Sequence, residues 1–313
     1  ARIAGERIVD GHADLLADDI FCLSAGPELL DCLEFDDRLR YVDVIDDAAF
    51  LAMDLEYLGR PDLAGFFVDR YLDLTGDDGP GSLWHFSIAY RAVVRAKVDC
   101  VRYTQGHPEA VPDAVRHLGI ALDHLRRGAV RLIVVAGAPG TGKSTLARAL
   151  AGPLDAVVLS TDDVRAELAV AGEISGAPGT LGAGLYRAEN IAAVYDALLE
   201  RAHRTVSLGR SVLLDGTWGD PRQRDRVRAL AAQGSCPLTE LVCAAPLADT
   251  VTRIETRTAT TSQVTPDIAA ALAADDRWSP AHWPRAHRID TTVPPAESAA
   301  VALEICRTPN PVP

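Results

Sequence analysis

Lysine is almost absent from this sequence of 313 residues, in which arginine carries the basic charge and the only lysines are Lys97 and Lys143. Acidic residues outnumber basic ones 44 to 31, so the chain lacks the basic excess of proteins that bind a nucleic-acid backbone. Residues 1–127 hold 24 acids and 13 bases, and the remainder holds 20 and 18. The charge argues against a nucleic-acid partner, although a 5′ end stays open as a phosphoryl acceptor.

Membrane and secretion signals are also missing. No apolar run approaches the ~20 residues that cross a membrane, and the opening Ala-Arg-Ile-Ala is not a signal segment. The six cysteines form no CxxC and no metal-type pair with histidine, which favours free thiols in a reducing cytosol. We therefore expect a cytoplasmic protein with no membrane partner. The chain also lacks an initiating Met, and we expect it to be incomplete at its N-terminus.

The spacing of apolar residues along the sequence divides the chain into two parts. Residues 1–103 open with a loop-and-hairpin stretch and then become helical, with apolar residues at helical spacing over 82–103. Residues 111–127 are expected to form a further helix, which ends at a glycine. We expect a first domain over 1–103, a helical linker over 104–130 and a second domain over 131–313.

The second domain alternates apolar strands with helices, which predicts an α/β fold with a parallel sheet covered on both faces. A stretch rich in Gly and Pro, residues 172–184, should form either a flexible connection or a substrate-side loop. The expected strands are 131–136, 156–160, 211–215, 238–243 and 287–290, and the expected helices are 143–151, 162–171, 186–207, 220–233, 246–257 and 295–305.

A phosphate-binding loop follows the first of these strands. Its glycines allow a tight turn that points backbone N–H groups at phosphate oxygens, and the helix N-terminus adds partial positive charge. Lys143 would bridge the β- and γ-phosphates of ATP, and the Ser144 hydroxyl would bind Mg²⁺. The alternative is a glycine-rich turn that happens to contain a lysine. The motif G-x-x-x-x-G-K-[ST] is matched by Gly137, Ala138, Pro139, Gly140, Thr141, Gly142, Lys143 and Ser144, and Thr145 continues into the helix.

A carboxylate, Asp215, ends the expected strand 211–215, as in a Walker B element. It would hold Mg²⁺ or orient the substrate, unless it merely ends the strand. A GTPase is excluded because the chain has no guanine-reading Asn/Thr-Lys-x-Asp motif. A motor ATPase usually has Glu after the strand-end Asp, but Asp215 is followed by Gly216 and Thr217. The pattern favours a small kinase.

An acceptor-side base is expected after the strand 156–160, where the sequence continues Thr161-Asp162-Asp163-Val164-Arg165. Ligands of α/β sheets bind at the carboxyl ends of the strands. Asp162 could therefore accept the proton of the acceptor hydroxyl, with Arg165 about one turn further on. The alternative is that Thr161 or Asp162 is only a helix N-cap, a role that suits Thr161 better.

Two arginines predict a lid over the phosphates. Arg253 and Arg257 are four residues apart, so they share a helix face, and a stretch rich in Thr and Ser follows them. Mobile arginines next to a polar segment would close over the nucleotide and neutralise charge during transfer. The alternative is a solvated charged helix face.

These pieces together give residues 131–305 a resemblance to the small P-loop kinases, among them gluconate kinase, the 5′-polynucleotide kinase domain and zeta-toxin-like proteins. The matching segments are GAPGTGKS, STDDVR, VLLDGTW, RIETR and HRIDTT. The resemblance implies Asp162 as the base, Arg165 as a substrate ligand, and Arg253 and Arg257 as lid residues. It leaves the acceptor open, because these kinases phosphorylate unrelated hydroxyls.

The segment Gly11-His12-Ala13-Asp14-Leu15, continued to Ile20, resembles the catalytic loop of aminoglycoside and choline kinases. The resemblance implies Asp14 as a base, and Asp19 and Asp31 as Mg²⁺ ligands. Ala13 replaces a glycine and Asp19 an asparagine of that pattern. The upstream lobe with its glycine-rich loop is not in this sequence, so we expect the first domain to be inactive alone. The alternative is an acidic hairpin without chemistry.

The sequence thus predicts a kinase that moves the γ-phosphoryl of Mg·ATP to a hydroxyl of a small molecule or nucleotide. The rival hypothesis is a regulatory ATP-binding module coupled to a degenerate or truncated first domain. Neither the acceptor nor the oligomeric state follows from the sequence.

Overall fold

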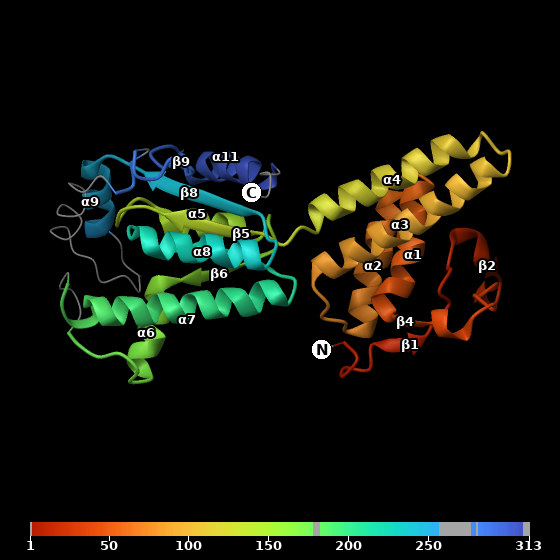
Figure 1. The fold of residues 1–313 in the computed structure, drawn as a ribbon, viewed down its shortest axis with the longest axis horizontal. Coiled ribbons are helices and arrows are strands. Elements are labelled where there is room, and N and C mark those ends of the chain that lie inside the picture. Colours follow the sequence, from red (N-terminus) through yellow and green to blue (C-terminus); the bar gives the residue numbers. More distant parts are fainter. Residues whose placement is uncertain (1, 178–181, 257–276, 280, 309–313) are drawn as a thin grey trace. The chain divides into compact units, whose positions relative to one another are not determined.

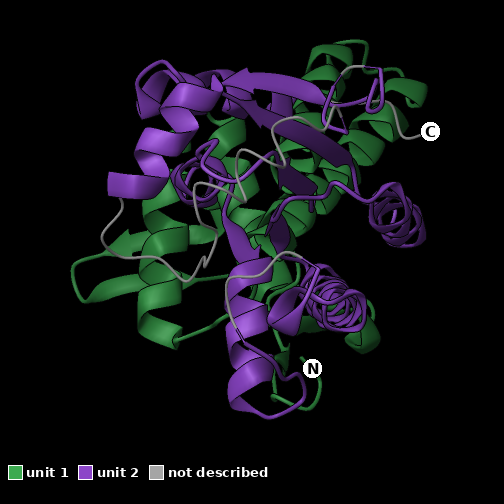
Figure 2. Ribbon diagram, turned by 90° about the vertical axis from the view of Figure 1, so that its left-hand side faces the viewer, with its two compact units in different colours: residues 1–129 green, residues 130–313 purple. Residues whose placement is uncertain are grey.

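The chain folds into two compact units, residues 1–129 and 130–313 (Figure 2). The computed structural model describes residues 2–177, 182–256, 277–279 and 281–308. None of the described helices is long and apolar enough to cross a membrane.

Unit 1 begins with short strands and continues as four helices. Strand β1 (Ile8–Asp10) pairs antiparallel with β4 (Tyr41–Asp43), and β2 (Ile20–Leu23) forms a hairpin with β3 (Gly26–Leu29). Two single 3₁₀ turns, η1 (Ala17–Asp19) and η2 (Asp37–Leu39), lie between the strands. The helices are α1 (Val44–Tyr57), α2 (Pro61–Thr75), α3 (Gly81–Thr104) and α4 (Ala110–Arg127).

Helix α1 forms the centre of unit 1, and its apolar side chains pack with Trp84 and Ile88 of α3 and with Ala121 of α4. The expected linker 104–130 is therefore wrong for most of its length. Helix α4 packs against α3 through a buried contact between His117 and Asp99, which makes it part of unit 1. The sequence pattern identified the helix but could not reveal that contact.

Unit 2 is built on a five-stranded parallel sheet in the order β6-β7-β5-β8-β9, with helices on both faces (Figure 1). Each expected strand and helix is present in it, and the ends differ by at most two residues where the chain is described. The strands are β5 (Leu132–Ala136), β6 (Ala156–Ser160), β7 (Ser211–Asp215), β8 (Leu238–Ala244) and β9 (His287–Asp290). The helices are α5 (Lys143–Ala151), α6 (Thr161–Val170), α7 (Ala188–Ser207), α8 (Pro221–Gln233), α9 (Leu247–Thr256) and α11 (Pro295–Arg307), with a 3₁₀ turn η3 (Gly184–Tyr186) before α7.

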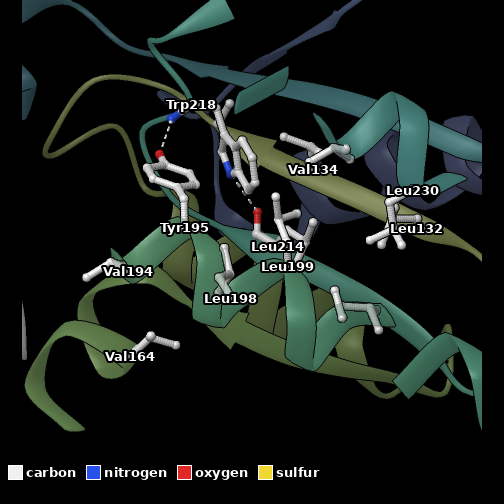
Figure 3. Close-up of a cluster of buried hydrophobic side chains, with 14 of the residues drawn as sticks. Leu132, Val134, Val164, Val194, Tyr195, Leu198, Leu199, Leu214, Trp218 and Leu230 are labelled. Carbon is white, nitrogen blue, oxygen red and sulfur yellow. Dashed lines mark hydrogen bonds between the residues drawn. The ribbon is translucent and has the colours of Figure 1, made fainter. Parts of the chain in front are cut away.

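Alternate residues of the central strand β5 face opposite sides of the sheet, as the pleat requires. Leu132 and Val134 pack with Leu198 of α7 and Leu230 of α8 (Figure 3). Ile133 and Val135 belong to a second core, which includes side chains of α5 and α11. Burial on both faces explains why the central strand β5 is a continuous apolar run in the sequence.

Candidate functional site

The phosphate-binding loop lies between β5 and α5, as the motif predicts. Gly137 and Gly140 have φ angles of 141° and 80°, which L side chains rarely adopt. A Cβ atom would also lie 2.6 Å from the carbonyl oxygen of Cys243 at Gly137, and 2.7 Å from that of Thr250 at Gly140. Both glycines are therefore needed by geometry, because the loop runs tightly against β8 and α9.

The loop is closed on itself around one carbonyl oxygen. Thr141 Oγ1 donates to the oxygen of Ala138 at 2.7 Å, and Lys143 Nζ donates to the same oxygen at 2.9 Å. Thr141 is buried, whereas Lys143 stands at the first position of α5. The ammonium group is thus held at the mouth of the loop, beside the N–H groups of a helix N-terminus.

Ser144, in the first turn of α5, contacts Asp215 at the end of β7. The Ser144 hydroxyl donates to Asp215 Oδ2 at 2.5 Å, and Asp215 is only 4% exposed. Burial raises the pKa of the Asp215 carboxyl, while the nearby Lys143 and the Ser144 hydrogen bond act to lower it. A hydroxyl and a buried carboxylate that touch are oxygen donors of the kind that Mg²⁺ prefers, so these two residues fit the ion.

Strand register places a third element beside this pair. Asp215 lies opposite Val135 of the central strand on one side and opposite Ser160 of β6 on the other. Asp162 follows Ser160 by two residues, so it lies at the same carboxyl edge of the sheet as the phosphate-binding loop. Asp162 is close enough to Asp215 to act on the pKa of its carboxyl.

Ser160, and neither Thr161 nor Asp162, caps helix α6. Its side-chain oxygen accepts from the Asp162 N–H at 3.2 Å, and α6 begins at Thr161. Both capping alternatives from the sequence are therefore wrong. The last residue of β6, Ser160, is itself the N-cap of α6, so no loop separates the strand from the helix. The Asp162 side chain instead accepts a short hydrogen bond from Arg165 Nη1.

Arg165 is fixed by contacts that the sequence did not indicate. It is 9% exposed, and its guanidinium carbon lies 4.5 Å from the ring centre of Tyr186. Within the described chain, its buried Nε has no hydrogen-bond partner. A buried guanidinium whose Nε–H has no partner among the described residues has hydrogen-bonding capacity that an anion or a carbonyl oxygen could use.

Tyr186 reaches Arg165 because the preceding loop is folded back on α7. Asn190 Nδ2 donates to the carbonyl oxygens of Ser175 and Gly184, at 3.0 and 2.9 Å. The described parts of the stretch 172–184 contain no strand or helix before η3 begins at Gly184. A signal for this arrangement would have been Asn190 itself, a buried amide close to the start of a helix.

Tyr195 and Trp218 support the segment that follows Asp215. Tyr195 OH accepts from the backbone N–H of Trp218 at 3.2 Å, and Trp218 Nε1 donates to the Leu214 carbonyl at 3.1 Å (Figure 3). Trp218 adopts a φ of 51° and is fully buried. These bonds hold the chain in a sharp turn directly after the buried carboxylate.

A cavity of about 450 Å³ opens beside the phosphate-binding loop. Arg253 forms part of its wall and donates to the Thr291 carbonyl at 2.6 Å, while Thr291 Oγ1 donates to the Thr141 carbonyl at 2.8 Å. Arg253 is thus tied to the segment after β9, and Arg257 lies outside the described residues. The lining residues are Gly142, Thr145, Leu146, Arg253, Thr291, Thr292, Val293, Pro294, Pro295 and Ser298.

The candidate residues of unit 1 lie on a loop that α1 holds in place. Asp47 accepts the backbone N–H groups of His12 and Ala13, at 3.0 and 2.7 Å. Ala13 has a φ of 67°, a conformation that a glycine would adopt without strain. Burial raises the pKa of the nearby Asp14 carboxyl, while Arg95 acts to lower it.

The two expected metal ligands of unit 1 have different surroundings. Asp19 Oδ2 accepts the Leu16 N–H at 2.9 Å, and Asp31 is exposed with a φ of 62°. Across the described residues of both units, no three His, Cys, Asp or Glu side chains are grouped to hold a metal ion. Asp14, Asp19 and Asp31 therefore form no such group, and their roles stay predictions.

The sheet, the loop and the buried carboxylate define unit 2 as a P-loop nucleotide-binding domain of the α/β class. In agreement with this, residues 132–276 match the family described as an AAA domain.

Two mycobacterial proteins, both described as uncharacterized, are similar over nearly the whole chain. They come from Mycobacterium tuberculosis (strain ATCC 25618 / H37Rv) and Mycobacterium bovis, and each is 54% identical over 307 residues. The alignments cover 98% of this chain and 61% of each relative, so the chain spans about 61% of the length of these proteins.

Solved structures of kinases align with part of the chain. A sugar kinase of Janibacter sp. is 19% identical, with a TM-score of 0.42, over 56% of this chain and 94% of that one. A gluconokinase of Sinorhizobium meliloti is 18% identical, with a TM-score of 0.41, over 57% and 91%. The APS kinase of Mycobacterium tuberculosis in complex with AMPPNP and APS is 15% identical, with a TM-score of 0.38, over 56% and 97%.

Proposed function

We propose that unit 2 is an ATP-dependent phosphotransferase that moves the γ-phosphoryl group of ATP to a hydroxyl of a small molecule or nucleotide. The observation that carries the proposal is the carboxyl edge of the sheet. There the phosphate-binding loop, the Ser144–Asp215 pair and the carboxylate of Asp162 lie on three neighbouring strands, β5, β7 and β6. A GTPase switch or a motor ATPase also needs the phosphate-binding loop and the Ser144–Asp215 pair. A carboxylate on the acceptor side, such as Asp162, is needed in addition by a kinase.

Nucleotide binding would use the loop and the cavity beside it. The N–H groups of the loop and Lys143 would hold the β- and γ-phosphates. Lys143 would leave the Ala138 carbonyl for the phosphates, because an ammonium group binds an anion more strongly than a neutral oxygen. The cavity lined by Thr145, Arg253 and Thr291 would take the base and ribose, since it opens directly from Gly142 of the loop.

Phosphoryl transfer would then take place at the carboxyl edge of the sheet, where the neighbouring strands β5, β7 and β6 end. The acceptor oxygen attacks the γ-phosphorus, the bond from that phosphorus to the bridging oxygen breaks, and ADP leaves. The hydroxyl proton passes to the Asp162 carboxylate. Arg165, fixed by Tyr186, would bind the acceptor close to this base. Mg²⁺, when bound by Ser144 and Asp215, would neutralise charge on the phosphate oxygens.

Unit 1 supports a narrower proposal. In the first loop of this unit, Asp47 accepts the backbone N–H groups of His12 and Ala13, and Asp14 of that loop is its candidate base. Residues 1–129 contain no second glycine-rich loop that could bind the phosphates of ATP. We therefore propose that Asp14 takes no part in phosphoryl transfer by this chain. Asp14→Asn should therefore leave the rate of phosphoryl transfer unchanged within about twofold. A large loss would contradict the proposal that unit 2 alone carries out the transfer.

The kinase proposal is tested by incubating the protein with γ-labelled ATP and a metabolite extract. We expect label in a new phosphorylated product, identified by mass spectrometry, and none with Lys143→Ala. Release of labelled phosphate without a labelled product would contradict the kinase and favour the regulatory ATP-binding module. If ATP binds in calorimetry but is neither hydrolysed nor used for transfer, the regulatory ATP-binding module is likewise favoured.

A further inference from the structure

The turn directly after β7 exposes one residue between buried neighbours. Thr217 is exposed, whereas Gly216 before it and Trp218 and Gly219 after it are buried. The turn begins at the carboxyl edge of the sheet, where Asp215 ends the strand. Thr217 is therefore accessible to a ligand at this edge, while the rest of the turn packs into the protein.

The same turn is held in a strained conformation. Trp218 has a φ of 51°, which is an outlier for a residue with a bulky side chain. Nε1 of Trp278 donates to the Thr217 carbonyl at 2.6 Å, and a Cβ atom at Gly216 would lie 2.7 Å from Cγ2 of Thr161. Backbone strain persists only where the surrounding contacts enforce it, and it is concentrated at functional sites. The packing thus fixes the place of Thr217.

Strand register places Thr217 between the phosphate-binding loop and the candidate base. Gly137, Thr217 and Asp162 each lie two residues beyond positions that pair with one another in β5, β7 and β6. Strand β7 is the middle one of these three. The Gly137 N–H also donates to the Thr217 carbonyl at 3.5 Å. Thr217 therefore adjoins the loop on one side and the strand that leads to Asp162 on the other.

A chain of hydrogen bonds orients the Thr217 hydroxyl. The Tyr195 oxygen accepts from the Trp218 N–H at 3.2 Å, and the Tyr195 hydroxyl is also hydrogen-bonded to the Thr217 side chain (Figure 3). Burial raises the pKa of Tyr195, so its proton stays in place at neutral pH. Because its oxygen already accepts from the backbone, Tyr195 can donate this proton to Thr217 Oγ1. The Thr217 hydroxyl then keeps its own proton for another acceptor.

We propose that the Thr217 hydroxyl is a further catalytic group, which donates a hydrogen bond to an oxygen of the γ-phosphoryl group during transfer. The inference rests on the proposed kinase function of unit 2. The transferred group would pass from the loop toward the acceptor at Asp162, and Thr217 lies between the two. A donor that is already in place stabilises the charge of the transition state without reorganisation. Tyr195 is a positioning residue, because it acts through Thr217.

Removing the hydroxyl should slow transfer without weakening substrate binding. ATP would still be held by the N–H groups of the loop and by Lys143, which Thr217→Val leaves unchanged. Loss of one preorganised donor costs a buried site about 10²- to 10³-fold in rate, and an exposed donor less, so we expect a fall of about 10- to 100-fold. Thr217→Ser keeps the donor and should stay within about threefold of the wild-type rate.

The test measures transfer from γ-labelled ATP to the metabolite extract, with the extract supplied in a dilution series. Thr217→Val should lower the rate at saturating extract, while the dilution that gives half of that rate, ATP affinity by calorimetry and the melting temperature stay unchanged. The control is Thr205→Val, about 15 Å further along α7 than Tyr195. Its hydroxyl donates to the Arg201 carbonyl at 2.9 Å within the helix, and this variant should match the wild type.

A double-mutant cycle tests the role of Tyr195. Tyr195→Phe should lower the saturating rate about 3- to 10-fold in the wild-type background. It should have little further effect in Thr217→Val, because there is then no hydroxyl to orient. Equal losses in both backgrounds overturn the positioning role of Tyr195.

The outcomes separate this inference from the kinase proposal. Wild-type transfer with an unchanged rate in Thr217→Val overturns the inference alone. A shifted half-saturating dilution at an unchanged saturating rate also overturns it, since Thr217 would then contact the acceptor and not the phosphoryl group. A wild-type protein that transfers no label overturns the kinase proposal, and the role of Thr217 falls with it.

Discussion

Replacing Asp162 with Asn separates a chemical role of this residue from a structural one. Asn has the same shape and keeps one oxygen for the Arg165 hydrogen bond, but it cannot accept the proton of a hydroxyl. If Asp162 is the base, phosphoryl transfer should fall by about 10²- to 10⁴-fold. The loss could lie at the lower end, because phosphoryl transfer depends mostly on positioning and charge.

The structure also sets the expected cost in stability. The Arg165 side chain is 11% exposed and that of Asp162 is 29% exposed, so the ion pair is only partly shielded from water. Exchanging a charged acceptor for a neutral one should cost about 1–2 kcal/mol. In a protein of this size that corresponds to a fall in melting temperature of roughly 2–8 °C. The cap of α6 is unaffected, because Ser160 supplies it.

The matched control is Ser160→Ala, which removes the cap and leaves the carboxylate. It should cost about 1 kcal/mol of stability while transfer stays within a few-fold of the wild-type rate. The assays are labelled transfer to the acceptor found in the extract, calorimetry of ATP binding and thermal melting. Unchanged transfer in Asp162→Asn refutes the role as base and directs attention to Asp163 or Asp215. Loss of transfer together with ATP affinity would assign Asp162 to Mg²⁺ binding.

Three further predictions concern unit 2. Lys143→Ala should lower ATP turnover by at least ~10²-fold while the protein stays folded, since the hydrogen bond that Nζ makes among the described residues goes to the Ala138 carbonyl. A small fall in melting temperature is expected, because Lys143 also acts to lower the pKa of the buried Asp215 carboxyl; an unfolded variant would contradict the prediction. Asp215→Asn should raise the melting temperature of nucleotide-free protein at neutral pH, because burial raises the pKa of Asp215 and its ionisation opposes folding. The gain should vanish as the pH falls below the ordinary Asp value of 3.8, and a gain independent of pH would refute the cause. Glu240→Ala should cost about 3 kcal/mol in denaturant unfolding and Glu240→Gln about 1, because Glu240 is 5% exposed and accepts from Trp283 and Arg228. Equal losses would contradict this, since they would show that the hydrogen bonds a Gln can keep contribute nothing.

Local patterns in the sequence were sufficient for the secondary structure of unit 2 and for its phosphate-binding loop. The inner strands β5, β7 and β8 are buried on both faces, so an apolar run locates each of them. The motif from Gly137 to Ser144 has nearly all of its determinants within eight consecutive residues. Asp215 was found in the same way, because a carboxylate at the end of an apolar strand is a local signal.

Contacts between distant residues were decided only by the tertiary structure. Thr291 bonds to Thr141 across 150 residues, and Arg165 meets Tyr186 because a loop folds back onto Asn190. The sequence does not identify the N-cap of α6, because Ser, Thr and Asp are all good capping residues. Only the backbone geometry shows that Ser160 is at that position. Helix α4 was placed in a linker for a similar reason: its periodicity shows that one side is apolar, but only packing shows which helices that side covers.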